Sequence, residues 1–421
     1  MVTSLLRPPP RKSAAPAPWA AAVAVAALVA AVPAAAAWRV EVTPEVTARV
    51  EASDNVNFAS TDRDALSDLS LWFEPALSWS LDRGDWRLEG RSREQVERFV
   101  EHDELDGSEP GHRVSLTWRP TPRLTLSLSE DFQRTRNLQD LFAAGAVVTE
   151  RTRVTTNEAE ASLTYQPTER WSLTASYTNY DSQSENPRFF DYLLHMVQAS
   201  ASRGLTERLG LTVGANLQDY DFNPTPGSRS RFFTRNYGLF AGIGYQGSER
   251  LDLTLQVGGR LTEQTVRFAV LDASRFPARL REEQDTTSNL ASTLSLRATY
   301  RFERGEARLD LSQDLTASAG SQGTLERRTA RLAARRWLSP DWRVDGAVVY
   351  SANKSDTTSN LVVGRDTRAW TLTGGLHYRI TDHLEAGLTL RRLRQHDTNL
   401  GTRVRRSTAM VSITGRWPKL L

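Results

Sequence analysis

One short hairpin pattern, repeated along the whole chain, most constrains how this protein can fold. In its clearest copy, at residues 245–258, a polar turn joins two segments in which apolar and polar residues alternate. Leu251, Leu253, Leu255 and Val257 therefore lie on one face of a β-strand, because strand side chains alternate between two faces. Similar copies lie at 119–128, 166–175 and 204–213, and looser ones begin near residues 302, 338 and 380. The repetition predicts an all-β fold built from consecutive antiparallel hairpins.

The first 37 residues have the features of a secretory signal peptide and lie outside the predicted fold. Arg7, Arg11 and Lys12 form a basic start, residues 20–32 an apolar stretch, and residues 35–37 a small-residue cleavage site. We expect cleavage before Trp38, which leaves a single domain of residues 38–421; a retained membrane-anchoring helix is the alternative. The chain has no cysteine, which excludes disulfides, cysteine metal sites and a lipoprotein anchor.

The connections between the predicted strands alternate between short turns and long loops. Turns such as 82–84 and 246–250 alternate with loops such as 135–155 and 266–286. The strands have about ten residues or more, enough to cross a bilayer when tilted, whereas strands of soluble proteins average about five to six. Aromatic residues gather at the turn ends of strands, where a membrane interface favours them. These residues are Trp79, Trp86, Trp118, Tyr165, Trp171, Tyr245, Tyr300, Trp337, Trp342, Tyr378 and Trp417.

Together these features favour a transmembrane antiparallel up-and-down β-barrel of about 18 strands, with short periplasmic turns and longer extracellular loops. Backbone groups inside a bilayer need partners within the protein, so such strands have to close into a barrel. A soluble β-sandwich, β-helix or propeller would also alternate, and it is the rival fold. The signal peptide and the barrel together predict the outer membrane of a Gram-negative bacterium.

The strand face opposite the leucines would line the lumen, and in the second half of the chain it carries many charges. The charged residues expected there are Arg297, Arg308, Asp310, Arg331, Arg335, Arg343, Asp345, Arg379, Glu385 and Arg391. Arginine–carboxylate pairs across strands can be plain wall structure. They can also form a pore wall that favours anionic or polar solutes. Both interpretations are open at the level of sequence.

One of the long loops, at about 135–155, is too apolar to stay in water. It contains Leu138, Leu141 and Phe142, followed by a run of alanine and valine. Burial of apolar surface is favourable, so we expect this segment to pack against the rest of the protein. It could constrict the barrel mouth, cap the rim or contact a neighbouring protomer. We favour the mouth, because the predicted lumen face is rich in glycine and leaves room.

No residue pattern indicates catalytic chemistry, a metal site or a cofactor. Asp131, Asp181, Asp219 and His396 lie near the predicted outer rim, where barrel enzymes hold their catalytic groups, so an enzyme is a third interpretation. The chain shows no glycine-rich phosphate loop after a strand and no metal-ligand spacing in a suitable context. Acids and bases are interspersed and the net charge is +3, which gives no indication of nucleic-acid binding.

The turn phrases at 167–171 (Pro-Thr-Glu-Arg-Trp) and 205–209 (Leu-Thr-Glu-Arg-Leu), with the signal peptide and the chain length, resemble the outer-membrane β-barrel porins of Gram-negative bacteria. Within that family the chain is similar to barrels found with exosortase and exopolysaccharide systems. The resemblance implies passive passage of polar or anionic solutes, or export of a polysaccharide, and it carries over no functional residues. A non-conducting scaffold or receptor barrel is the alternative. Such barrels usually end in Phe, whereas here Trp417 is followed by Pro-Lys-Leu-Leu.

The partners that follow from this interpretation are outer-membrane lipid, the barrel-assembly machinery and a polar solute or polysaccharide. A second copy of the chain is a further candidate partner. We expect no nucleic acid and no cofactor.

Overall fold

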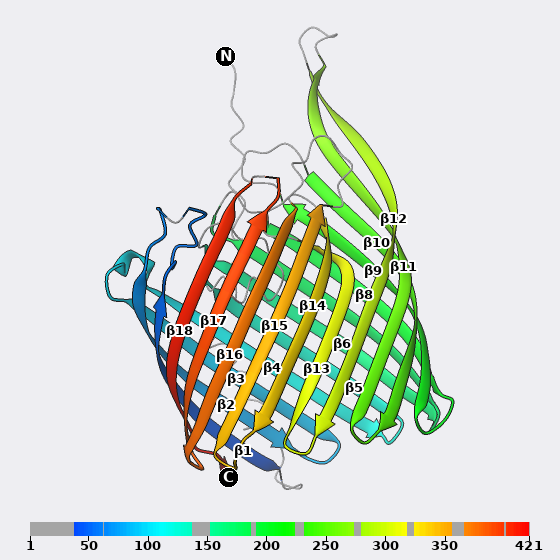
Figure 1. Cartoon of the computed structure of the whole chain (residues 1–421). Helices are drawn as coiled ribbons and strands as arrows, with labels where there is room; N and C mark the ends of the chain where they lie inside the picture. Colours follow the sequence, from blue (N-terminus) through cyan, green and yellow to red (C-terminus); the bar gives the residue numbers. More distant parts are fainter. Residues whose placement is uncertain are drawn as a thin grey trace.

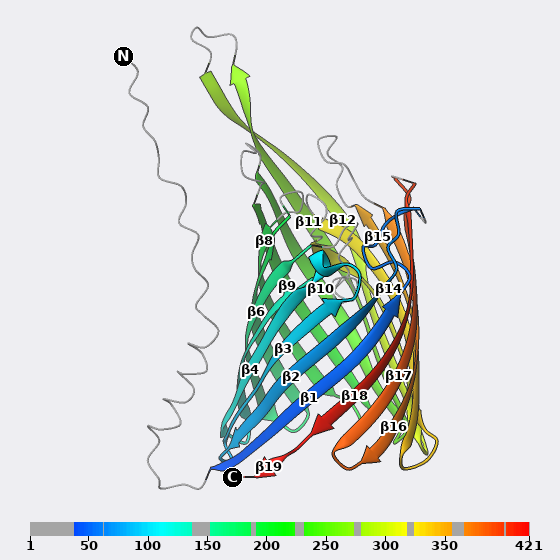
Figure 2. The same cartoon turned by 90° about the vertical axis from the view of Figure 1, so that its left-hand side faces the viewer.

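The computed structural model describes residues 38–420, except 62, 137–151, 187–190, 224–230, 273–278, 318–323, 356–365 and 400, and these residues form a closed barrel. Strands β1 to β18 follow one another around the barrel in chain order, each antiparallel to the next, and β18 pairs with β1 to close it. Figure 1 shows the strands inclined to the barrel axis, and Figure 2 shows β1 beside β18. The predicted up-and-down barrel and its strand number are confirmed.

The strands are long, as the sequence predicted. Their bounds are β1 Arg39–Ser53, β2 Asp68–Asp82, β3 Trp86–Phe99, β4 Gly107–Thr121, β5 Leu124–Thr135, β6 Val154–Thr168, β7 Trp171–Ser184, β8 Asp191–Gly204, β9 Leu209–Asn223, β10 Arg231–Ser248, β11 Leu251–Asp272, β12 Arg279–Phe302, β13 Gly305–Ala317, β14 Thr324–Trp337, β15 Trp342–Ser355, β16 Thr367–Thr381, β17 Leu384–Asp397 and β18 Arg403–Arg416. A 3₁₀ turn, η1 (Asp103–Leu105), precedes β4, and the short β19 (Lys419–Leu420) extends the pairing along β1.

The two ends of the barrel differ in their connections. Short turns follow the even-numbered strands at one end, called the turn end here, and longer connections follow the odd-numbered strands at the other, the loop end. In the turn after β2, Gly84 adopts a φ of 80°, and its N–H donates to the Asp82 carboxylate at 2.9 Å. That left-handed conformation suits glycine, which has no Cβ to clash. Within the described part of the chain, no helix has the length and apolar character to cross a membrane.

Strands β11 and β12 form an arm that extends beyond the rim at the loop end (Figure 1). They pair with each other as far as Asp272 and Arg279, whereas β10 pairs with β11 only up to Arg267. The loop predicted at 266–286 is therefore wrong over most of its length. Beyond Arg267 the backbone pairing of β11 and β12 continues without the apolar alternation that marks a strand in the sequence.

The two faces of the wall differ as the alternation predicted. The apolar side chains point outward and are exposed: Leu239 is 70% exposed and Leu372 57%. Polar side chains on the other face crowd together inside the barrel, where Gln95 is 5% and Asn236 1% exposed. The outward apolar residues of β11 run from Leu251 to Leu261. At about 3.3 Å per residue and a tilt near 40°, they span about 25 Å, the height of a membrane-facing band.

Aromatic side chains border this band at both edges. Trp86 stacks on Trp118 near the turn end with ring centroids 4.8 Å apart, and Tyr350 contacts Trp370 near the loop end at 4.6 Å. Trp337 is an exception to the predicted girdle. It lies opposite Arg343 in the register, and the guanidinium groups of Arg343 and Arg379 lie over its ring. Trp337 faces inward because it is an odd number of residues from the outward Leu332.

Candidate functional site: the barrel lumen

All ten charged residues predicted for the lumen fall on the inward face of β12 to β17. Two arginines bind the carboxylate of Asp310 on β13. Arg297 reaches it from the neighbouring strand β12 at 2.9 Å, and Arg308 reaches it along β13 at 2.7 Å. Arg331 lies opposite Asp310 on β14, and Arg391 lies opposite Thr373 of β16. The register alone sets these neighbours, because inward residues on adjacent strands are directly opposite one another. We call this set of inward charges the arginine wall.

The rest of the arginine wall continues the pattern through β14 to β17. Arg335 binds Glu306 at 2.9 Å, and Arg343 binds Glu385 at 3.1 Å. His377 joins the wall between Asp345, at 2.8 Å, and Glu385, at 3.3 Å. Sequence reasoning placed His377 in a strand but assigned it no role, although its alternation with Arg379 puts both on the inward face. Gly375 and Gly387 beside it leave the space that its ring occupies.

The turn-end half of the lumen is open to water along this wall. The side chain of Arg297 is 61% exposed and that of Arg335 51%, even though both are ion-paired. Exposed pairs of this kind contribute little to stability, about 0–1 kcal/mol. The wall therefore presents hydrated guanidinium groups to the lumen, and a polar solute passing this half of the barrel would meet them.

The opposite wall, on β1 to β6, carries the other sign of charge. On this wall the inward carboxylates outnumber the inward arginines. The carboxylates are Glu45, Glu51, Glu74, Glu89, Glu97, Glu109, Asp131, Glu158 and Glu160, and the arginines are Arg49, Arg87, Arg91, Arg93 and Arg113. Arg49 binds Glu74 at 3.2 Å and Arg91 binds Glu45 at 2.8 Å. A solute in the lumen thus lies between a wall rich in arginine and a wall rich in carboxylates, so the field across the lumen has a direction.

The lumen is packed, not open, at part of its loop end. Tyr220 and Phe222 of β9, Phe232 of β10, Val266 of β11 and Leu315 of β13 form a buried apolar cluster. Tyr192 of β8 packs against it, with its ring 5.8 Å from that of Phe222. We call this group the mouth cluster.

Leu315 reaches the mouth cluster because the end of the β13–β14 hairpin turns inward. Strand β12 pairs with β13 only as far as Leu294 and Gln313, and above that point it leaves with β11 to form the arm. Because it no longer pairs with β12, the hairpin end contacts β11 instead. The side-chain amide of Gln264 on β11 donates to the hydroxyl of Thr324 on β14 at 3.3 Å. Arg260, which is 3% exposed, lies 3.9 Å from the carboxylates of Asp314 and Glu326.

A second group fills the mouth at the seam between β1 and β18. Arg406 binds Glu51 at 2.7 Å, both nearly fully buried, and its guanidinium group lies 4.6 Å from the ring centroid of Phe58. Phe58, in the connection after β1, is 2% exposed. The mouth is thus narrowed from two sides by described residues. The apolar loop predicted to constrict it, with Leu138, Leu141 and Phe142, lies outside the described residues.

The four residues considered for a rim enzyme are not brought together. Asp131 faces inward and binds Arg113 at 2.6 Å, whereas Asp219 faces outward and binds Arg235 at 2.9 Å. Asp181 accepts a hydrogen bond from Gln183, and the His396 ring lies 3.1 Å from the carbonyl of Thr402. Among the described residues, no group of three or more histidines and carboxylates is arranged to hold a metal.

Comparisons with known proteins return similarity in fold alone. No protein-family model matches the chain, and no curated protein matches it. Among solved structures, OpdL of Pseudomonas aeruginosa is 12% identical, with a TM-score of 0.41 over 91% of this chain and 99% of that one. OpdQ of the same organism is 9% identical, with a TM-score of 0.44 over 90% and 98%. The ferric-catecholate import receptor Fiu of E. coli K12 is 8% identical, with a TM-score of 0.47 over 89% and 81%.

Proposed function

We propose that this barrel spans the outer membrane of a Gram-negative bacterium, with its turn end in the periplasm and its loop end outside. An exposed apolar band about 25 Å tall supports this, because such a surface is costly in water and matches the hydrocarbon layer. Aromatic residues at both edges of the band support it further. The signal peptide predicted at residues 1–37 supplies the export route.

Within that membrane the protein is a pore for polar solutes, in which the arginine-lined side of the lumen attracts anions. The observation that carries this function is the arginine wall, whose guanidinium groups stay exposed in the turn-end half of the lumen. Charged side chains that line a pore select solutes of the opposite sign. Its partners on this proposal are the surrounding lipid, the barrel-assembly machinery and the transported solute, and self-association of the barrel is part of the same proposal.

A non-conducting receptor or scaffold is the second candidate. The packed mouth favours it, because the mouth cluster and the Arg406–Phe58 contact narrow the lumen from two sides. The arm formed by β11 and β12 favours it too, since a ribbon that rises beyond the rim offers backbone and side chains to a partner outside the cell.

Single-channel recording in planar bilayers decides between the two. The wild-type protein should give stepwise conductance, and its reversal potential in a KCl gradient should show a preference for chloride. Replacing Arg331 and Arg335 with Gln should reduce that preference about twofold or more. Arg231→Gln, on the outward face of β10, is the matched control and should leave it unchanged. A folded, inserted barrel without conductance would establish the receptor instead, and a cation preference would rule out the anion pore.

Export of a polysaccharide, as the resemblance to exosortase-associated barrels suggests, is the finer form of the pore proposal. A sugar polymer that enters the lumen displaces ions, so it should reduce the conductance reversibly when added on the turn-end side. A polymer that leaves the current unchanged at every chain length would limit the pore to small solutes.

A further inference from the structure

Five arginines form an outward-facing patch at the loop end of β16, β17 and β18. Arg394 lies directly opposite Arg405 and next to Trp370, while Arg392 lies beside Ser407. Arg368 and Arg403 flank His396 in the next row toward the loop end. All five arginines are exposed, and they share their face with Leu372 and Leu390. We call this set the outer arginine patch; it is separate from the arginine wall of the lumen.

On β16, β17 and β18, none of the described residues that lie directly opposite the patch arginines in the register is acidic. Several outward arginines elsewhere at the loop end are paired: Arg235 with Asp219 at 2.9 Å, Arg231 with Asp221 at 3.2 Å and Arg98 with Asp106 at 2.9 Å. None of the five patch arginines forms an ion pair with another residue that the structure describes. Like charges directly opposite each other, such as Arg394 and Arg405, destabilise a strand pair.

The nearest carboxylates that the structure describes form no ion pair with the patch arginines, although one of them, Asp366, lies only two residues before Arg368. Asp54 accepts a hydrogen bond from the N–H of Ser407 at 2.6 Å, and Asp397 of β17 faces inward and is 2% exposed. The patch therefore has a cost that an external anion would remove. Such an anion would have to approach from outside the barrel, because the arginines point away from the lumen.

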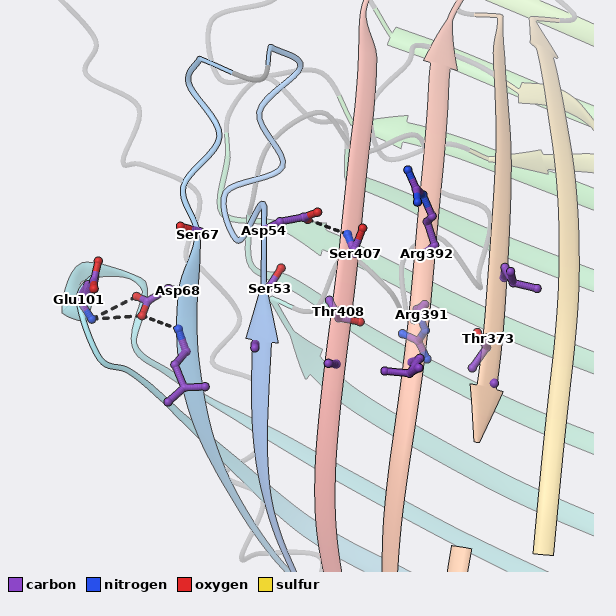
Figure 3. A pocket seen from close by; sticks show the side chains of 16 residues that line it. Ser53, Asp54, Ser67, Asp68, Glu101, Thr373, Arg391, Arg392, Ser407 and Thr408 are labelled. Atoms are coloured by element: carbon purple, nitrogen blue, oxygen red, sulfur yellow. Dashed lines mark hydrogen bonds between the residues drawn. The ribbon is translucent and has the colours of Figure 1, made fainter. Parts of the chain in front are cut away.

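Directly below the patch, the outer wall has a shallow groove of about 950 Å³, which is apolar along its floor and bordered by Asp54, Asp68 and Glu101 on its β1–β2 side. The register sets Leu390, Ala409, Ala52 and Leu69 side by side across β17, β18, β1 and β2. The two alanines form a low floor between the leucines, and beside Leu390 a Cβ added at Gly374 would meet only open space. Figure 3 shows this stretch of wall, with Arg392 above Arg391 and Thr373, toward the loop end.

We propose that the outer arginine patch and the groove together bind a phosphorylated lipid of the outer leaflet. The guanidinium groups would donate to the phosphate oxygens, since the planar fork of arginine matches phosphate geometry. An acyl chain would lie along the leucine–alanine groove, where it buries apolar surface. The site rests on the proposed membrane location, because only there does the loop end of the outward face meet lipid head groups.

The test measures lipid retention by the detergent-purified, full-length protein, counted by native mass spectrometry. The probes are diphosphoryl lipid A, the same lipid without its phosphates, and phosphatidylcholine. The wild-type protein should retain diphosphoryl lipid A about tenfold better than either other lipid. The triple variant Arg392→Gln, Arg394→Gln and Arg405→Gln should lose this preference. A triple variant at paired outward arginines, Arg98→Gln, Arg231→Gln and Arg235→Gln, removes the same charge and should keep it.

Retention that ignores the phosphates, or that survives in the patch variant, overturns the proposal. Complete displacement by millimolar inorganic phosphate would also overturn it, because the site would then bind free phosphate and not a lipid. If the patch variant does not fold, the wild-type preference among the three lipids decides the question alone. Insertion into phosphatidylcholine vesicles is measured in parallel. Failure to insert contradicts the membrane location, whereas insertion without lipid preference contradicts only this site.

Discussion

At the scale of single residues, the position of a side chain on the strand decides what it can do. Val257 and Gln256 are neighbours on β11, yet Val257 faces outward and is 50% exposed while Gln256 faces the lumen. The same alternation puts Trp337 inside, although aromatic composition alone suggested the membrane edge. The same substitution should therefore affect stability differently at adjacent positions, because one side chain faces an apolar environment and the other faces the polar lumen.

Val257→Arg should destabilise the barrel by about 2–4 kcal/mol, because it puts a charge near the middle of the lipid-facing band. Gln256→Arg should have a much smaller effect, since the added charge would lie in the polar lumen. Unfolding of the two variants from lipid vesicles in a urea titration measures the difference. Equal losses of stability would show that the two faces, or the membrane itself, are assigned wrongly.

At the scale of elements, strand length determines the shape of the mouth. Because β12 leaves β13 above Leu294, the end of the β13–β14 hairpin is free to turn inward and place Leu315 in the mouth cluster. The arm and the narrowed mouth thus have one cause. A β12 that ended at the rim would have kept the hairpin end in the wall.

Leu315→Ala should raise the conductance of an open pore, because it loosens the hairpin end that narrows the mouth. The free energy of unfolding should fall by about 2–5 kcal/mol, as for other buried leucines cut to alanine. Conductance steps and urea unfolding give the two readouts. Leu332→Ala, exposed on the outward face of β14, is the control and should leave conductance unchanged. A folded Leu315→Ala protein with wild-type conductance would show that this hairpin end is no constriction.

At the scale of the whole molecule, the barrel separates two chemically different ends. The connections after even-numbered strands, all short, lie at the turn end, and those after odd-numbered strands, all longer, lie at the loop end, because consecutive strands are antiparallel. The outer arginine patch, the arm and the mouth cluster all lie at the loop end. The orientation in the membrane therefore determines which of these features meets the outside of the cell.

Single cysteines can report this orientation cleanly, because the chain contains none. A cysteine at Thr398, in the connection between β17 and β18, should react with a membrane-impermeant maleimide on intact cells. A cysteine at Ser248, at the turn end of β10, should react only after the outer membrane is opened. Both positions are exposed, so accessibility of the side chain does not bias the comparison. Labelling of Ser248 alone on intact cells would invert the proposed topology.

The sequence by itself determined the class of fold, the strand number and the face on which each wall residue lies. Alternation with a period of two is a local property, and so is the contrast between short turns and long loops. The same information placed all ten charged residues of the arginine wall, from Arg297 to Arg391, on the inward face. It did not show which of them pair, because partners such as Arg343 and Glu385 come from strands that are not consecutive.

Only the tertiary structure decided where the chain departs from a plain cylinder. Gln264 of β11 meets Thr324 of β14 although two strands separate them in the barrel order, and Arg406 meets Ser53 at the seam where the barrel closes. Residues 60 and 353 positions apart make these contacts, so no local pattern encodes them. The arm escaped prediction for the opposite reason: its two strands pair through the backbone, and that pairing needs no apolar alternation in the sequence. The groove below the outer arginine patch likewise became visible only once closure of the barrel set β18 beside β1.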